Sequence, residues 1–200
     1  TKRVSRSGKR DLLKKLTLVL LTYNRQSFAL RNMRYWSGKG VQLIVIDGSE
    51  CPIPSVSLDN LKNNIHYQHM ATTLAQRLSF ACELIDTEYV SMISDDEFYL
   101  TTGLESSIYE LELDPSLVAC MGRAVTFNLS RDGEYLDANE CYLKHAGYEI
   151  TGESSGERMF NNMNRYVMSN FWSVVRRDVF RDSHAAFLRK PFLVYALWEL

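Results

Sequence analysis

The sequence has few of the residues that mark special structural classes. It holds only four cysteines and four prolines in 200 residues. The cysteines form no Cys-x-x-Cys pair, so neither a zinc site nor a redox motif is predicted, and a reducing compartment is the simpler expectation. No apolar run approaches the roughly 18 residues that span a bilayer, and no secretory signal pattern is present. These absences predict an ordinary globular domain.

The sequence also lacks a large excess of charge of either sign. Its net charge is -1, so no overall field attracts nucleic acid, and we expect no nucleic-acid partner. Positive charge gathers locally in the segment 1–15, which we interpret as a basic arm or linker: Lys2, Arg3, Arg6, Lys9, Arg10, Lys14 and Lys15. Such an arm is a mobile solvated tail or the end of a linker, or it contacts anionic lipid or an acidic partner. We expect a cytoplasmic protein, and a chain truncated at its C-terminus.

With 46% hydrophobic and 24% charged residues, the chain is long enough for one well-packed domain. Apolar runs of strand length alternate with helical patterns, as strands at 16–22, 41–46, 64–69 and 89–93 and helices at 26–39 and 71–86. This alternation predicts a Rossmann-like α/β fold with a mostly parallel central sheet flanked by helices. Right-handed crossovers would place Thr22, Asp47 and Asp95 at the same, carboxyl edge of that sheet.

The second half of the chain has weaker patterns. We predict a helix over 103–113, a strand over 117–129, and irregular structure from 134 to 164. An apolar run at 171–175 and a helix over 179–188 follow. A loop as long as 134–164 in a compact domain is typical of a functional or mobile segment.

Three adjacent carboxylates follow the strand at 89–93, namely Asp95, Asp96 and Glu97. Adjacent ionised carboxylates repel one another unless water or a cation offsets their charge. Mg²⁺ and Mn²⁺ prefer oxygen ligands and commonly bridge one or two carboxylates to phosphates. The pattern therefore indicates a metal-diphosphate site. The alternative is a solvated acidic turn in which an Asp caps the helix starting near Thr102.

Three segments, taken in order, resemble the nucleotide-binding half of the GT-A glycosyltransferases, particularly the family-2-like group. They are Leu18-Val-Leu-Leu-Thr-Tyr-Asn-Arg25, Val45-Ile-Asp-Gly-Ser49 and Tyr89-Val-Ser-Met-Ile-Ser-Asp-Asp96. The resemblance implies a GT-A domain over 16–200, with a nucleotide-binding half at 16–115 and an acceptor half at 116–200.

The resemblance also implies roles for individual residues. Thr22, Tyr23 and Arg25 would line the nucleotide pocket, and Asp47 would hydrogen-bond the base, unless Asp47 is only a turn former. The D-x-D motif of the family aligns with Ser94-Asp95-Asp96, so its first acid is replaced by serine. Asp96 would then be the metal ligand for Mn²⁺ or Mg²⁺, and Asp95 would contact the ribose or the metal.

Inverting members of the family use a carboxylate to take the proton of the acceptor hydroxyl. Glu199 lies in the matching part of the chain, although it is equally compatible with an ordinary helix residue. Asp178 and Asp182 are rival candidates, and the choice between inversion and retention stays open.

The resemblance implies a glycosyltransferase that moves a sugar from a nucleotide-sugar donor, with UDP-sugar favoured, to a glycan such as a surface polysaccharide or to another hydroxyl acceptor. The alternative is a catalytically degenerate GT-A domain that binds sugar or acts as a scaffold, and the serine in D-x-D keeps it open. A receiver-type phosphotransfer domain is disfavoured, because such domains carry acids at the first strand tip, where this chain has Thr22-Tyr23-Asn24.

Overall fold

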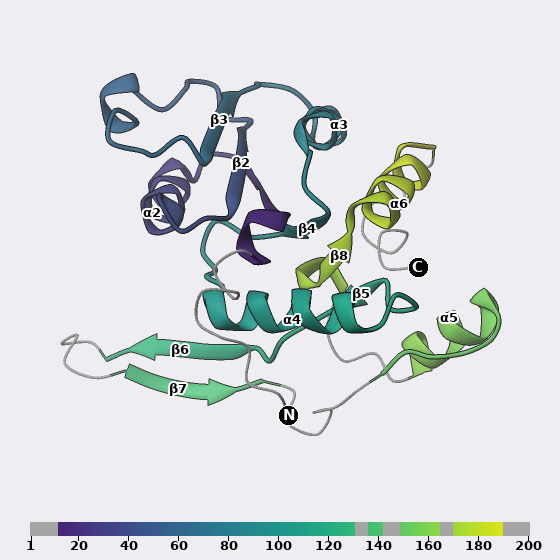
Figure 1. Ribbon diagram of the computed structural model, residues 1–200. Coiled ribbons are helices and arrows are strands. Elements are labelled where there is room, and N and C mark those ends of the chain that lie inside the picture. The colour runs from purple at the N-terminus through teal and green to yellow at the C-terminus, as the bar shows by residue number, and fades with distance from the viewer. Residues whose placement is uncertain (1–11, 131–135, 142–148, 165–169, 190–200) are drawn as a thin grey trace.

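The computed structural model describes residues 12–130, 136–141, 149–164 and 170–189 (Figure 1). A six-stranded central sheet has the order β3-β2-β1-β4-β8-β5. Its strands are β1 (Leu16–Thr22), β2 (Gln42–Asp47), β3 (Ile65–His69), β4 (Tyr89–Met92), β5 (Ala119–Cys120) and β8 (Val174–Arg176). The first four strands of this order pair in parallel, whereas β8 runs antiparallel to both β4 and β5. The predicted mostly parallel α/β sheet is thus confirmed.

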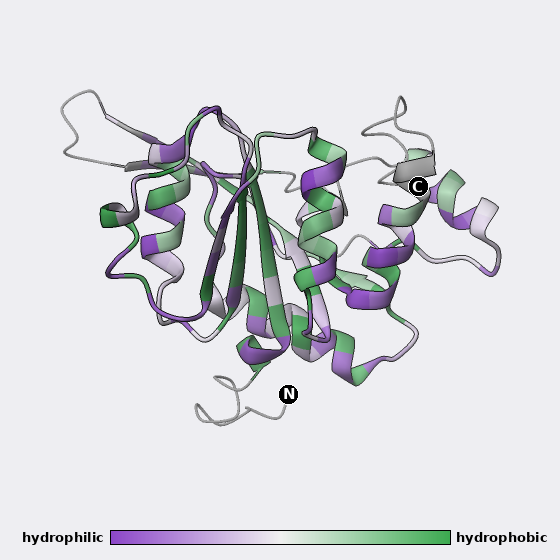
Figure 2. Cartoon of the chain, turned by 90° about the horizontal axis from the view of Figure 1, so that it is seen from above, coloured by the Kyte–Doolittle hydropathy of each residue, from purple (hydrophilic) through white to green (hydrophobic). Residues whose placement is uncertain are grey.

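The central strands read as continuous apolar runs because both faces of the sheet are covered. In β1 every residue except Leu21 is buried. Leu18 and Leu20 belong to one hydrophobic cluster and Val19 to the other, as expected when successive side chains point to opposite faces. Figure 2 shows these strands as a hydrophobic layer between helices on either side.

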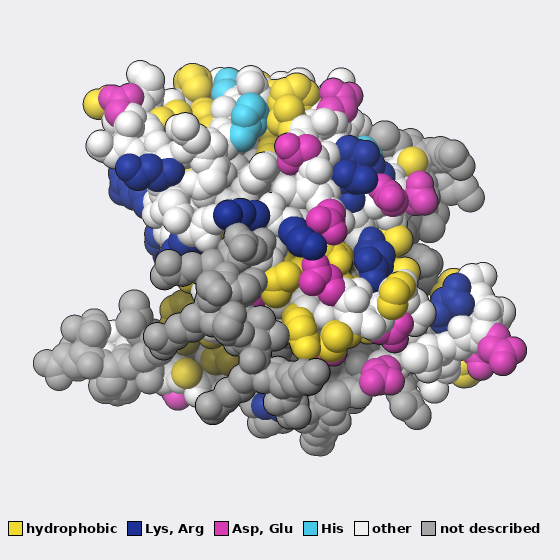
Figure 3. All heavy atoms as spheres, in the orientation of Figure 1, with side chains coloured by type: hydrophobic (Ala, Val, Ile, Leu, Met, Phe, Trp, Pro, Cys, Tyr) yellow, Lys and Arg dark blue, Asp and Glu magenta, His cyan; other side chains and the backbone are white. Residues whose placement is uncertain are grey.

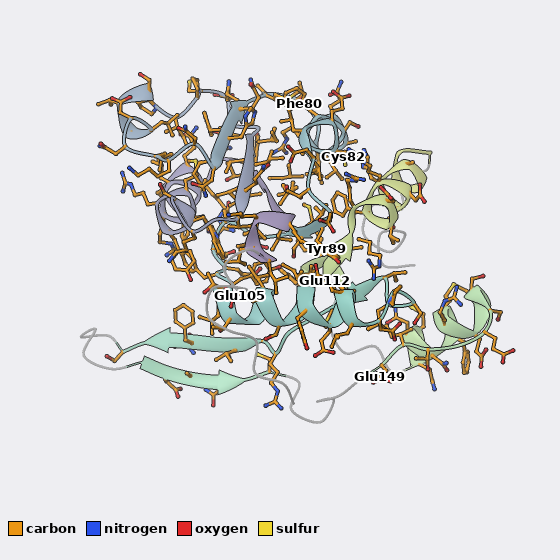
Figure 4. The ribbon with its side chains drawn as sticks, in the orientation of Figure 1. Phe80, Cys82, Tyr89, Glu105, Glu112 and Glu149 are labelled. Atoms are coloured by element: carbon orange, nitrogen blue, oxygen red, sulfur yellow. The ribbon has the colours of Figure 1, made fainter. Side chains whose placement is uncertain are left out.

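Helices α2 (Gln26–Trp36) and α4 (Thr101–Leu113) supply one cluster, and α3 (Leu74–Leu84) and α6 (Arg177–Arg189) supply the other. Tyr89 of β4 packs in the α2/α4 cluster, while Phe80 and Cys82 belong to the α3 side (Figure 4). A capping box starts α3, in which the Thr73 hydroxyl accepts from the Gln76 amide and the Gln76 side chain accepts from the Thr73 amide. Such reciprocal capping satisfies two otherwise unpaired amides.

The described end of the basic arm packs onto the domain. Leu12 and Leu13 are buried, and a short 3₁₀ helix, η1 (Leu13–Lys15), leads into β1. The Lys15 Nζ lies 2.6 Å from a Glu112 carboxylate oxygen on α4. The remaining arm residues, 1–11, lie outside the described residues, so its predicted membrane contact stays a prediction. In the described ranges no helix has the length and hydrophobicity of a membrane span.

The second half of the chain departs from the predicted elements. The strand predicted over 117–129 is two strands, β5 and β6 (Val125–Leu129), with Gly122 between them. Strand β6 pairs with β7 (Leu136–Glu140) in a separate two-stranded sheet. The segment predicted to be irregular also contains α5 (Ser155–Asn164). Both β7 and α5 are mostly polar in sequence, so neither has the apolar pattern on which the prediction depends.

Other boundaries shift by a few residues. A short 3₁₀ helix, η2 (Ser55–Ser57), lies in the connection between β2 and β3. The apolar run at 171–175 divides into a 3₁₀ helix, η4 (Asn170–Trp172), and β8. Helix α6 begins at Arg177, inside the predicted polar break, directly after β8, and the Arg177 amide donates to the Glu88 carbonyl.

Candidate functional site

The carboxyl ends of β1, β2 and β4 meet at one edge of the sheet. Thr22 of β1 is paired in register with Asp47 of β2. On its other side, the Thr22 hydroxyl donates to Asp95 Oδ2 over 2.9 Å. The Gly48 amide donates to the Thr22 carbonyl over 2.9 Å. The parallel pairing of these strands therefore brings the three motifs together at the edge where open α/β sheets bind ligands.

Arg25 joins the first motif to the acidic one. Its Nε lies 3.2 Å from Asp95 Oδ1, and its Nη2 lies 2.8 Å from Asp96 Oδ2. The hydrogen bond from Arg25 lowers the pKa of Asp96. Arg25 reaches this position from the N-cap of α2, after Asn24 adopts a left-handed backbone conformation with φ 56°. The Asn24 amide donates to the Ser49 hydroxyl, which ties the loop to the second motif.

The three consecutive carboxylates point to different partners. Asp95 is 6% exposed, and both of its carboxylate oxygens are engaged, by Thr22 and by Arg25. The side chain of Asp96 is 46% exposed. Glu97 accepts a hydrogen bond from the indole of Trp172. None of them caps α4, because its N-cap is Leu100 and no side chain bonds there. The capping alternative is therefore wrong.

Asp47 is fully buried and is surrounded by donors. Its Oδ1 accepts from the amide and hydroxyl of Ser49, and its Oδ2 accepts from Gln26 and the Tyr67 hydroxyl. Burial by itself would raise the pKa of Asp47, but the hydrogen bonds from Ser49, Gln26 and Tyr67 outweigh it and lower that pKa. Burial, together with the neighbouring Asp47 carboxylate, raises the pKa of Tyr67 to about 12. Asp47 thus organises the loop after β2.

Arg77 is a site residue that sequence analysis missed. It is 7% exposed, and its Nη1 donates to the Thr22 carbonyl over 2.6 Å. Gly48 is needed beside it, since a Cβ at Gly48 would lie 2.5 Å from the guanidinium carbon of Arg77. Burial lowers the pKa of Arg77. One feature of the sequence could have indicated that Arg77 is buried. Its helical spacing places it on the same apolar face as Leu74, Leu78 and Ala81.

The structure separates Asp178 from the other predicted site residues. Strand β8 is antiparallel to β4, and Arg176 pairs with Tyr89 at the amino end of β4. Asp178, which follows β8, therefore lies at the edge opposite Asp95 and Asp96. It is exposed and pairs with Arg177 over 3.1 Å. This position does not support the predicted role of Asp178 as catalytic base, and the role of Asp182, further along α6, stays a prediction. Glu199 lies outside the described residues, and Tyr23 is 58% exposed at the rim.

Protonation of Asp47 at acid pH should lower the free energy of unfolding. Because its pKa in the folded state lies below the ordinary value of 3.8, the ionised carboxylate stabilises the fold above that value. This stabilisation is lost as the pH falls through the folded-state pKa. Urea unfolding of the wild type should show a falling free energy of unfolding between about pH 5 and pH 3. Asp47→Asn should show a smaller change over this range, whereas Asp96→Asn should keep nearly the wild-type change, because Asp96 is exposed. Equal changes in wild type and Asp47→Asn would contradict the assignment.

Comparisons with known proteins support the fold. No protein-family model matches the sequence, and no curated protein matches it either. Among solved structures, TarS residues 1–349 from S. aureus, a GT-A-type glycosyltransferase, superposes with a TM-score of 0.50 at 14% identity. The match covers 84% of this chain and 48% of that one, so the chain spans about half the length of the matched structure. The chain has a glycosyltransferase-like fold.

Proposed function

We propose that the protein is a nucleotide-sugar-dependent glycosyltransferase whose donor site is the edge where β1, β2 and β4 end. The observation that carries this proposal is the bridge of Arg25 to Asp95 and Asp96, which sets a guanidinium and an accessible carboxylate side by side. A guanidinium forms paired hydrogen bonds with phosphate oxygens. The glycosyltransferase-like fold supports the same reading.

In this proposal a divalent cation, Mn²⁺ or Mg²⁺, would be held at this edge through one carboxylate. Within the described ranges no three His, Cys, Asp or Glu side chains are grouped as a metal site. Asp96 is accessible and would be the direct ligand, while donor phosphates and water complete the shell. Asp95 would hold Thr22 and Arg25 in place, since both of its oxygens are engaged. When bound, the cation neutralises charge on the departing nucleoside diphosphate.

The nucleoside would lie over the loops that follow β1 and β2. Tyr23 offers an exposed ring beside the rim, and aromatic faces stack on bases of any sequence. Asp47 would position Ser49 and Tyr67 instead of meeting the base directly, because four donors already occupy its oxygens. Backbone groups of the loop after β2 would then read the base, and UDP-sugar remains the expected donor.

The acceptor would be a glycan bound by the second half of the chain. Trp172, held at the acidic tip by Glu97, offers an aromatic surface on that side of the site. Glu199 remains the candidate for the proton acceptor. A cytoplasmic location, with the basic arm touching a membrane, completes this proposal.

A second candidate function is a degenerate domain that binds nucleotide-sugar without transferring it. The observation that favours it is Ser94, which stands where the D-x-D motif has its first acid. Nucleotide binding without transfer to any glycan acceptor would support this candidate over the enzyme.

Thermal unfolding with UDP-, GDP-, CDP- and TDP-linked sugars, with and without Mn²⁺, tests the donor site. One base should raise the melting temperature by about 5 °C or more at 100 times its dissociation constant. The shift should require Mn²⁺. Stabilisation by no nucleotide under either condition would refute the donor site.

A further inference from the structure

Positive charge is concentrated in the first part of the chain. Residues 1–46 contain eleven Lys and Arg residues and one acidic residue, whereas residues 47–200 contain twelve and 23. A chain with a net charge of -1 is therefore strongly polarised. Figure 3 shows Lys and Arg side chains gathered over α2, which this first part builds. Such an asymmetry indicates a surface that meets an anionic partner.

Three exposed cations lie together at the C-terminal end of α2, and we call them the basic face: Arg34, Lys39 and Lys62. The Gly38 amide donates to Asn64 Oδ1 over 2.9 Å, and the Lys62 amide donates to the Ser37 hydroxyl over 2.9 Å. These bonds pin the turn after α2 to the segment before β3. The stem of Lys62 passes over this turn, because its Cγ lies 3.7 Å from the position of a Cβ on Gly38.

The basic face is not neutralised by neighbouring acids. In the part of the chain that the structure describes, no carboxylate forms an ion pair with any of its three cations. The segments that build it, 34–40 and 55–64, carry one acid, Asp59. The dipole of α2 accounts for Arg34 alone, which lies in the last turn. The charges of Lys39 and Lys62 are therefore available to an anionic partner.

A hollow with a volume of about 280 Å³ lies beside the basic face. The residues that line it are Arg34, Ser37, Val56, Ser57, Asn60 and Leu61. The side chain of Val56 is 73% exposed. Cations around an exposed apolar side chain fit a bilayer, because anionic headgroups pair with the cations and the acyl boundary accepts the apolar group. A nucleic acid offers phosphates but no apolar phase for Val56.

The basic arm joins the domain beside the basic face. Leu13 is buried, and its Cβ lies 3.9 Å from the position of a Cβ on Gly40, next to Lys39. Strands β1 and β2 both begin here, since Thr17 pairs with Gln42. The basic face is thus at the amino edge of the sheet, opposite the candidate site. The 11 residues of α2 separate the two edges by roughly 16 Å, at about 1.5 Å per residue.

From this arrangement we infer that the amino edge of the sheet is a docking surface for a membrane that contains anionic phospholipid. The basic face supplies the charge, and Val56 enters the headgroup region. This inference rests on the membrane contact in the proposed function, which it extends from the arm to the folded domain, and it is independent of the donor site. A protein docked in this way holds the candidate site away from the headgroups and open to ligands from solution.

Sedimentation of the full chain with lipid vesicles tests the docking surface. The wild type should bind phosphatidylcholine vesicles that contain about 30% phosphatidylserine, and this binding should weaken as salt rises. The double variant Lys39→Gln and Lys62→Gln should bind about 25-fold more weakly. Each Lys or Arg near an anionic surface contributes about a fivefold factor.

The double variant Arg123→Gln and Arg158→Gln is the matched control, because it removes the same charge elsewhere. Arg123 follows β5, the strand at the opposite end of the sheet order, and Arg158 is in α5, far from α2 in Figure 1. This variant should bind the vesicles less than about threefold more weakly, since charges beyond a Debye length from the membrane are screened.

Val56→Asn tests the apolar contact without changing charge. It should weaken vesicle binding about threefold, as expected if about half of the valine side chain leaves water on docking. Its binding to heparin, a polyanion without an apolar phase, should equal that of the wild type. Equal vesicle binding by Val56→Asn and wild type would overturn the insertion of Val56 and the docking geometry with it.

The remaining outcomes separate the docking surface from the rest of the proposed function. Equal vesicle binding by wild type and the Lys39 and Lys62 variant would overturn the docking surface and leave contact through the arm standing. Absence of wild-type binding to anionic vesicles would overturn both, but not the donor site, because the assay contains no nucleotide. Equal losses in the two double variants would overturn the surface in favour of net charge. Tighter binding to duplex RNA than to vesicles, lost in the Lys39 and Lys62 variant, would assign the basic face to nucleic acid instead.

Discussion

If the proposed function holds, Asp96→Asn is expected to lower the rate of sugar transfer at least about 100-fold, because the departing diphosphate would lose the cation proposed to neutralise it. The variant keeps the shape of the side chain but removes its charge. Release of UDP from a UDP-sugar in the presence of Mn²⁺ measures the rate. Stability should change by less than about 1 kcal/mol, because the pair of Asp96 with Arg25 is exposed to solvent.

Glu97→Gln is the matched control for that experiment. Glu97 is the next residue, but its carboxylate is held by the Trp172 indole. Its replacement should reduce the rate by less than about tenfold, the effect of losing a hydrogen bond worth about 1 kcal/mol. A rate in Asp96→Asn equal to that of the wild type, with the same response to Mn²⁺, would refute the role of Asp96. An equal loss of rate in both variants would show that the rate depends on the total negative charge after β4 and not on Asp96 in particular.

Asp47→Ala is expected to lower the free energy of unfolding by about 3 to 5 kcal/mol, the cost of removing one partner from a buried charge cluster. The substitution leaves Ser49, Gln26 and Tyr67 with unpaired donors. It also removes a negative charge that favours the protonated form of buried Arg77. Urea unfolding at neutral pH measures the change. The free energy of unfolding of a typical domain is only about 5 to 15 kcal/mol, so a loss of this size would be easily detected.

Tyr67→Phe separates this cluster from simple loss of packing. The variant removes one donor to Asp47 and also the hydroxyl that the Ile53 amide bonds over 2.8 Å. It should cost about 1 to 2 kcal/mol. If Asp47→Ala destabilised the protein no more than Tyr67→Phe does, Asp47 would not be the centre of the cluster.

The surface beside the candidate site carries positive charge from arginine side chains of α2. Lys and Arg side chains gather over α2 on the face shown in Figure 3. Arg25 is at the start of this helix, and Arg31, further along it, is close enough to contribute to lowering the pKa of Asp96. A locally basic rim on a protein of net charge -1 draws anionic ligands toward one edge. Donor binding should therefore weaken as salt concentration rises.

The central strands and the meeting of three motifs were predictable from the sequence alone. Strands β1, β2 and β4 are buried on both faces, so each reads as an unbroken apolar run that local inspection detects. Because these strands run parallel, their carboxyl ends share one edge, and this brings Thr22, Asp47 and Asp95 together. These features depend on local pattern and a general rule of chirality.

Only the tertiary structure decided which polar groups at that edge are available. Asp47, Asp95 and Asp96 all follow an apolar strand in the sequence, yet only Asp47 and Asp95 are buried and bonded by donors from distant segments. The residues next to an aspartate in the chain do not determine which distant segments will bury it. Arg77 looked like an ordinary helix residue until Gly48 was found beneath its guanidinium. Asp178 was misplaced because the direction of β8 depends on the strand it pairs with, and no residue within a three-residue strand specifies that partner.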